Sequence, residues 1–146
     1  MPSMQHKDLY TFLASTGPGG AARTAKLATV RADGSPHVAP IWVAFDGDDL
    51  LFTTHRDSLK GKTLQRDSRV SLCFDDETPP FAFAVVNGTA TISEDPTELL
   101  QWATEIGGRY MGPAKADAYG RRNGVAGELL VRVHPTKVFG ATGVAD

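Results

Sequence analysis

The residues best suited to chemistry lie in one basic stretch, RDSLKGKTLQRDSR (56–69). It holds five of the fifteen Lys and Arg residues of the chain, against two acidic residues. Its Gly61-Lys62-Thr63 triplet matches the end of a nucleotide-binding P-loop, which has another glycine five positions earlier. Arg56 stands there instead, so this loop lacks the residue that lets a backbone wrap around a triphosphate. A P-loop NTPase is therefore nearly excluded as the function of this chain.

The same stretch suits a single phosphate group. Thr53 and Thr54 end an expected strand, and Asp57 or Ser58 can cap a short helix over 59–66. The first N–H groups of such a helix lack acceptors and its dipole is positive there, which favours an anion. The anion would also meet the side chains of Lys60, Lys62 and Thr63. The alternative interpretation is a solvated helix face with exposed lysines.

The sequence contains no motif that identifies a catalytic side chain. The four histidines, His6, His37, His55 and His134, lack metal-ligand spacing, and there is no nucleophile motif. We therefore expect no metal site and no catalytic residue of the protein's own. Proteins of this kind often bind and orient a cofactor that carries the reaction.

The segments around the basic stretch are mainly β. The pattern predicts one domain, and its expected parts are an N-terminal helix (1–15), barrel strands (24–93) interrupted by the helix 59–66, a helix (96–109) and closing strands (127–142). The helix 96–109 is expected to end at Gly107-Gly108. This order is not a regular β-α-β alternation, so a Greek-key or split barrel with peripheral helices fits better.

Pro40 is unusual within the expected second strand. Proline cannot donate to a strand ladder, so it belongs at a sheet edge or a bulge. An edge would leave neighbouring backbone groups free to bind a ligand, and a simple bulge is the alternative.

The composition limits the binding partners and the cellular compartment that we expect for this protein. A net charge of −2 argues against nucleic acid as the main partner. The single cysteine, Cys73, lies in a strand-like segment, which indicates a packed thiol and fits a reducing cytoplasm. The N-terminus lacks a signal-peptide layout, and no apolar run approaches the roughly 20 residues that span a bilayer. We expect a soluble cytoplasmic protein without a membrane partner.

Three segments carry a family resemblance: LATVRADGSPHVAPIWVAFDGDDLLFTT, SLKGKTLQRDSRVSLCF and AVVNGTATI. In this order they resemble the split β-barrel flavoproteins related to pyridoxamine 5′-phosphate oxidase, and within them the branch that uses the deazaflavin coenzyme F420. The resemblance implies a six-stranded antiparallel Greek-key split β-barrel of the FMN-binding type. It also implies a homodimer with two cofactor sites at the subunit interface.

The resemblance assigns roles to particular residues. The ring of the cofactor would lie beside Pro40, Ile41 and Trp42, and Phe81 and Phe83 would lie near the substrate or in the core. The phosphate would be held by residues that end one strand and begin the next helix, namely Thr53, Thr54, Ser58, Lys60, Lys62 and Thr63. The first strand, LATVRADG, lacks the fuller Arg/Lys pattern of FMN binding, which favours the deazaflavin.

The expected function is that of an F420-dependent reductase, which passes a hydride from the reduced coenzyme to a conjugated small molecule. Proton delivery would come from solvent. The alternatives are an FMN-binding oxidase or flavin reductase of the same fold, and a non-catalytic protein that carries the cofactor. A chain ending in VFGATGVAD lacks the basic C-terminal motif of a true pyridoxamine phosphate oxidase, so that reaction is not expected.

Overall fold

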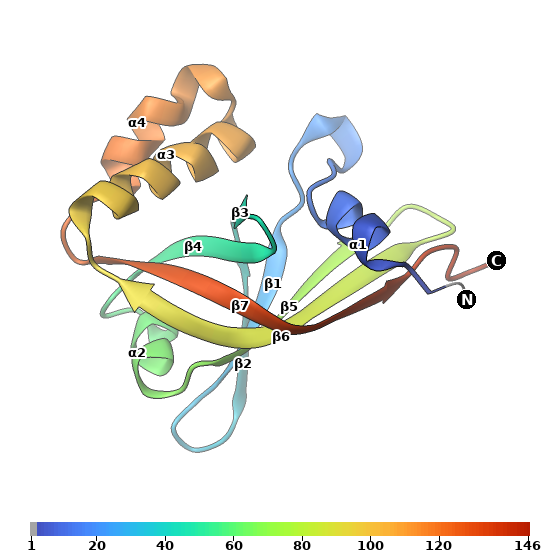
Figure 1. Ribbon diagram of the computed structural model, residues 1–146, viewed down its shortest axis with the longest axis horizontal. Helices are drawn as coiled ribbons and strands as arrows, with labels where there is room; N and C mark the ends of the chain where they lie inside the picture. Colours follow the sequence, from blue (N-terminus) through green and yellow to red (C-terminus); the bar gives the residue numbers. More distant parts are fainter. Residues whose placement is uncertain (1–2) are drawn as a thin grey trace.

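The computed structural model describes residues 3–146, and one antiparallel sheet of seven strands dominates it (Figure 1). The strands follow the order β2-β1-β5-β6-β7-β4-β3 across the sheet. In chain order the elements are α1 (His6–Leu13), a 3-10 turn (Pro18–Gly20), β1 (Ala25–Val30), β2 (Pro36–Ile41), β3 (Ala44–Asp46), β4 (Asp49–His55), α2 (Leu59–Arg66), β5 (Arg69–Asp76), β6 (Ala82–Ser93), α3 (Pro96–Met111), a 3-10 turn (Pro113–Lys115), α4 (Ala116–Asn123) and β7 (Glu128–Ala141).

The mainly β, antiparallel architecture is confirmed, but the expected number of six strands is wrong: the sheet has seven strands, and it does not close into a complete barrel. The expected second strand divides into β2 and β3, which lie at the two edges of the sheet. Only Trp42 and Val43 separate them, so the chain itself joins the two edges. Within residues 3–146 no strand pairing connects β2 to β3, and the sheet therefore stays open in its hydrogen bonding.

The break between β2 and β3 has a visible cause in the bonds of Val43. Its backbone N–H donates to the Tyr110 hydroxyl at 3.2 Å, and its carbonyl oxygen accepts from Arg109 Nε at 2.9 Å. Both partners belong to α3, so these backbone groups pair with a helix and not with a neighbouring strand. The edge position of β2 also confirms the expectation that Pro40 lies at a sheet edge, where its missing N–H costs no ladder bond.

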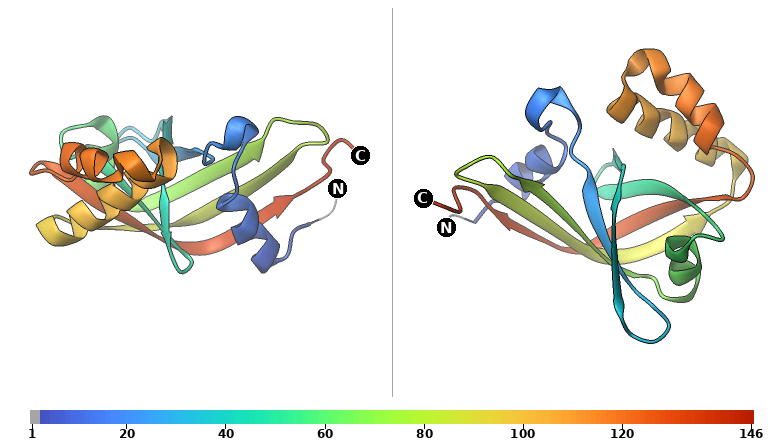
Figure 2. Two further views of the ribbon diagram at one scale, coloured as in Figure 1. Left: turned by 90° about the horizontal axis from the view of Figure 1, so that it is seen from above. Right: turned by 180° about the vertical axis from the view of Figure 1, so that it is seen from behind.

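The curled sheet encloses the main core, and α1 covers one opening of it (Figure 2). Alternate side chains of each strand face inward because successive side chains of a strand point to opposite faces. Leu9 and Leu13 of α1 pack against the enclosed residues and are almost fully buried. On the opposite face of β4 and β7, α3 packs with its apolar stripe of Leu99, Trp102 and Ile106. The helices α1 and α3 thus cover different faces of the sheet.

The helix α3 continues to Met111, so the expected end at Gly107-Gly108 is wrong. These glycines serve the packing of α4 on α3. A Cβ atom at Gly107 would lie 2.5 Å from Cβ of Tyr119, and one at Gly108 would lie 3.2 Å from Cβ of Ala116. The two helices therefore approach closely where the glycines stand, and they form one antiparallel pair above β4 (Figure 1).

The closing segment is one strand, β7, and a β-bulge interrupts its pairing with β6. Asn87 pairs with Lys137 and Gly88 pairs with Pro135, which leaves Thr136 as the extra residue. The Thr136 hydroxyl donates to the Asn87 carbonyl oxygen at 3.1 Å.

Cys73 lies in β5, and burial raises the pKa of its thiol, with a further contribution from Asp75. Among the described residues, no helix is both long enough and apolar enough to span a bilayer.

Candidate functional site

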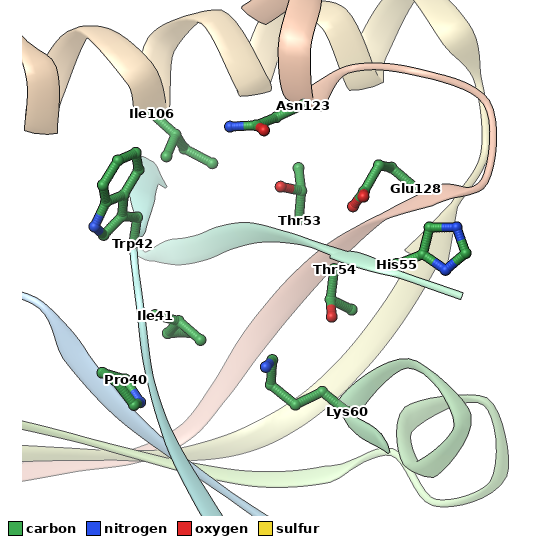
Figure 3. Close-up of a pocket in the computed structure, with 10 residues that line it drawn as sticks. All are labelled: Pro40, Ile41, Trp42, Thr53, Thr54, His55, Lys60, Ile106, Asn123 and Glu128. Carbon is green, nitrogen blue, oxygen red and sulfur yellow. The ribbon is translucent and has the colours of Figure 1, made fainter. Parts of the chain in front are cut away.

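A cavity of about 380 Å³ lies between α2 on one side and the helix pair α3–α4 on the other (Figure 3). Strands β2 and β4 and the start of β7 complete its walls. The cavity brings together six of the residues that the sequence assigns to a cofactor. Its lining comprises Pro40, Ile41, Trp42, Thr53, Thr54, His55, Lys60, Ile106, Asn123 and Glu128.

Ser58 fixes α2 to the end of β4. Its hydroxyl accepts a hydrogen bond from the Gly61 N–H at 3.0 Å, as a helix cap does, and donates to the His55 carbonyl oxygen at 2.7 Å. The hydroxyl oxygens of Ser58 and Thr54 lie 2.8 Å apart. Because a hydroxyl has one proton, Thr54 is the donor in this contact. Both hydroxyl protons are thus engaged in positioning the helix.

At this end of the cavity the lining donors are the ammonium group of Lys60, in the first turn of α2, and the hydroxyl of Thr53. The N–H groups of Leu59 and Lys60 lie in the first turn, where no acceptor exists within the helix. Within residues 3–146, Lys60 has no carboxylate partner within 4.0 Å. Its ammonium group points into the cavity (Figure 3). An anion bound here would meet the positive charge of Lys60 beside the start of α2, where the helix dipole is positive.

Gly61 allows α2 to lie directly against the turn that precedes it. A Cβ atom at this position would be 2.2 Å from the carbonyl oxygen of His55 and 3.0 Å from that of Arg56. Both neighbours are backbone atoms, which cannot turn aside as a flexible side chain can. The glycine of the Gly-Lys-Thr triplet therefore serves helix packing, and it is not part of the cavity lining.

Lys62 and Thr63 do not line the cavity. Lys62 is exposed, and it follows Lys60 by two positions, which turns a side chain by about 200° around a helix. Thr63 is buried, with 3% of its surface exposed. Of the two lysines expected to hold a phosphate, only Lys60 reaches this cavity within one chain.

Phe81 and Phe83 are also absent from the cavity lining. They lie at the start of β6 and just before it, in the hairpin that β5 and β6 form beside the C-terminus. This hairpin is at the opposite end of the molecule from α2 (Figure 1). Phe81 is 41% exposed and has a backbone φ of 69°.

An apolar wall faces the polar end of the cavity. It consists of Pro40, Ile41, Trp42 and Ile106. The Trp42 ring stacks on the Tyr110 ring with centroids 5.1 Å apart and planes inclined by 2°. The Tyr110 hydroxyl donates to the Arg23 carbonyl oxygen at 2.6 Å, and this bond fixes the ring on which Trp42 stacks. The indole is thereby held as a flat surface that could lie against a planar ring.

Four lining residues were not anticipated: His55, Ile106, Asn123 and Glu128. His55 and Glu128 are directly paired across β4 and β7, so their side chains share one face of the sheet. Partial burial raises the pKa of the Glu128 carboxyl, and the nearby His55 acts in the opposite direction. The sequence signal was an acid at the start of an otherwise apolar strand, in GELLVRV. Glu128 lies beside His55 because β7 pairs with β4.

The comparisons with known proteins agree with this architecture. A solved structure of a conserved hypothetical protein from Mycobacterium tuberculosis is 26% identical, covers 92% of this chain and 82% of that one, and has a TM-score of 0.78. A structure of an F420 reductase is 26% identical, covers 88% and 93%, and has a TM-score of 0.66. An FAD-binding protein from Mesorhizobium loti, 19% identical over 95% of both chains, shares the fold with a TM-score of 0.68. No curated protein sequence matches the chain.

The curled antiparallel sheet with a capped helix beside its cavity defines a split-barrel protein. The family model for pyridoxamine 5′-phosphate oxidase matches residues 12–140, which is most of the chain. The chain therefore belongs to the pyridoxamine 5′-phosphate oxidase family.

Proposed function

We propose that this protein binds the reduced deazaflavin coenzyme F420 and reduces a conjugated small molecule with it. The observation that carries the proposal is the composition of one cavity. An unpaired lysine and the first turn of a helix lie at one end, and a flat apolar wall lies at the other. The similarity to an F420 reductase supports the choice of this coenzyme over FMN.

The residues present fit such a coenzyme. Lys60, the Thr53 hydroxyl and the first amides of α2 would hold its phosphate, because all of them donate hydrogen bonds toward an anion. Trp42, Ile41 and Pro40 would lie against its ring. The bound coenzyme supplies a hydride, and the protein contributes placement of the ring and exclusion of water by the helix pair α3–α4.

We also propose that the working form is a homodimer. On the face of the sheet that carries Val38, two large apolar side chains are exposed: Val38 is 65% exposed and Phe139 of β7 is 40% exposed. The residues between them, in register with Val38, are small or polar: Ala28, Ser71 and Asn87. Because β2 contributes to both this face and the cavity, a second copy covering the face would also narrow the cavity mouth. A molar mass near twice 15.6 kDa in light scattering would support this.

Fluorescence titrations with F420 and with FMN test the cofactor proposal. We expect saturable binding of F420 that is tighter than binding of FMN, and tight FMN binding with no response to F420 would contradict it. Oxidation of the bound reduced coenzyme by enones and quinones then separates an enzyme from a carrier. Binding without turnover by any acceptor would favour the carrier.

A further inference from the structure

One acidic side chain in the cavity has no partner. Among residues 3–146, the Glu128 carboxyl makes neither an ion pair within 4.0 Å nor a side-chain hydrogen bond, although it is partly buried. A carboxylate in such a place loses hydration, and this raises its pKa although the nearby His55 acts in the opposite direction. In Figure 3 the carboxyl group points toward the interior of the cavity, on the side of Thr53.

The position of Glu128 is tightly defined. It begins β7 and pairs with His55 of β4. The connection from α4 is only four residues long, 124–127, and it ends in Gly127 with a φ of +95°. A Cβ atom there would lie 3.0 Å from Nε2 of His55, so both the backbone angle and the space favour glycine. Asn123, the last residue of α4, also lines the cavity.

Asn123 and Glu128 therefore present a carboxamide and a carboxyl group on one side of the cavity. A carboxamide N–H and a protonated carboxyl are both hydrogen-bond donors. Two donors on one side of a site suit a carbonyl oxygen that gains negative charge during a reaction. The other groups facing the cavity that carry or change charge are His55 on β4 and Lys60 on α2, whereas α3 and α4 contribute only Ile106 and Asn123.

We propose that Glu128 donates the proton that completes the reduction, and that the acceptor is an α,β-unsaturated carbonyl compound whose oxygen lies beside Glu128 and Asn123. This inference rests on the proposed function. With the reduced coenzyme bound, a hydride would be available to the β-carbon, where a C–H bond would form while the π electrons move to the carbonyl oxygen. Glu128 gives its proton to that oxygen and regains one from water, and the resulting enol converts to the ketone. The acceptor gains two electrons, which the coenzyme loses.

The first measurement is independent of turnover. The side-chain carboxyl carbons of ¹³C-labelled protein are titrated by NMR, with the Glu128 signal assigned by its loss in Glu128→Gln. We expect a pKa above the ordinary value of about 4.3 for glutamate, and a further rise when F420 is bound, because its phosphate adds negative charge to the cavity. An ordinary pKa with and without F420 would overturn the proposal.

The second measurement is turnover of cyclohexenone by the wild type, Glu128→Gln and Glu105→Gln. Glu105 is an exposed acid on α3 outside the cavity and serves as the matched control. We expect Glu128→Gln to lose about 10²-fold or more in kcat, to bind F420 at least as tightly as the wild type, and to lose the fall of kcat with rising pH. F420 binding with unchanged kcat and pH profile in Glu128→Gln would overturn the inference and leave the proposed function standing. A wild type that fails to bind F420 would overturn both.

Discussion

The hydroxyl oxygens of Thr54 and Ser58 lie 2.8 Å apart, and this contact joins the end of β4 to the first turn of α2. Ser58 adds hydrogen bonds to the Gly61 N–H and the His55 carbonyl oxygen, so one side chain holds the helix start in three directions. The position of Lys60 in the cavity depends on this arrangement. Ser58 does not line the cavity, so we expect any effect of this residue on anion binding to act through the position of α2.

The first prediction concerns Ser58→Ala. Loss of a helix cap costs about 0.5–2 kcal/mol, and we expect a decrease of that size in the free energy of unfolding, measured by urea denaturation. Ser68→Ala is the matched control, because the exposed Ser68 side chain makes no hydrogen bond among the described residues, and its effect should stay within about 0.5 kcal/mol. Equal stabilities of the two variants would show that the cap contributes nothing.

The second prediction separates the two lysines of α2. A charge-assisted hydrogen bond contributes roughly 1.5–3 kcal/mol, and about 1.4 kcal/mol corresponds to tenfold in affinity. We expect Lys60→Ala to weaken F420 binding about ten- to hundredfold, and Lys62→Ala to weaken it less than about threefold, because only Lys60 lines the cavity. Both variants remove one charge from the same helix. The reverse order of affinities in fluorescence titrations would move the phosphate site to the other face of α2.

The third prediction concerns Gly61→Ala. The new methyl group would meet the His55 carbonyl oxygen at 2.2 Å, so α2 must shift away from the turn. We expect a loss of about 1–3 kcal/mol in unfolding free energy, together with weaker F420 binding. In Gly17→Ala the nearest atoms lie at 3.7 Å and 3.9 Å and φ is −90°, so that control should unfold like the wild type. A stable Gly61→Ala variant with full affinity would refute the packing role of this glycine.

The fourth prediction tests how α3 is held above the cavity. In Tyr110→Phe the buried Val43 N–H loses its acceptor and the Arg23 carbonyl loses a donor. An unsatisfied buried group costs about 1–3 kcal/mol, which we expect to see in urea denaturation. Tyr119→Phe provides the comparison, since the Tyr119 hydroxyl makes no hydrogen bond within the part of the chain that the structure describes. If both variants unfolded alike, the Tyr110 hydroxyl would have no role in docking α3.

The fifth prediction concerns pH and the stability of the free protein. The folded-state pKa of Glu128 is raised, so between the unfolded and folded pKa values the native state binds more protons than the unfolded state. The contribution of Glu128 to stability therefore falls as pH rises through this window, and ionised Glu128 destabilises the fold above it. We expect Glu128→Gln to raise the melting temperature at pH 7 relative to the wild type, and to lose this advantage at pH 3. A variant that melts lower at pH 7 would mean that Glu128 is favourably paired.

The sequence predicted the elements whose signals are local. The helix 59–66 has a capping serine before it and follows a strand that ends in two threonines, and the structure places it at Leu59–Arg66. One proline limited the second strand to two alternatives, a sheet edge or a bulge, because proline lacks the donor that a central strand requires, and the structure has the edge. Six of the residues assigned to the cofactor line a single cavity for the same reason, since β2, β4 and α2 are all recognisable from local patterns.

Features that depend on distant pairing could not be predicted in this way. The interruption after Ile41 comes from bonds between Val43 and two residues of α3 that lie more than sixty positions later. The length of α3 was underestimated because Gly107 and Gly108 resemble a helix end, whereas their role is to admit α4. Glu128 and Asn123 reach the cavity only because β7 pairs with β4, and nothing in their own segment indicates that pairing.

A crystal structure of the protein with bound F420 tests the central claim most directly. The account predicts a phosphate oxygen within hydrogen-bonding distance of Lys60 Nζ and of the first amides of α2, with the ring against Trp42. F420 bound at another surface, or a phosphate held by Lys62 with Lys60 turned away, would contradict it.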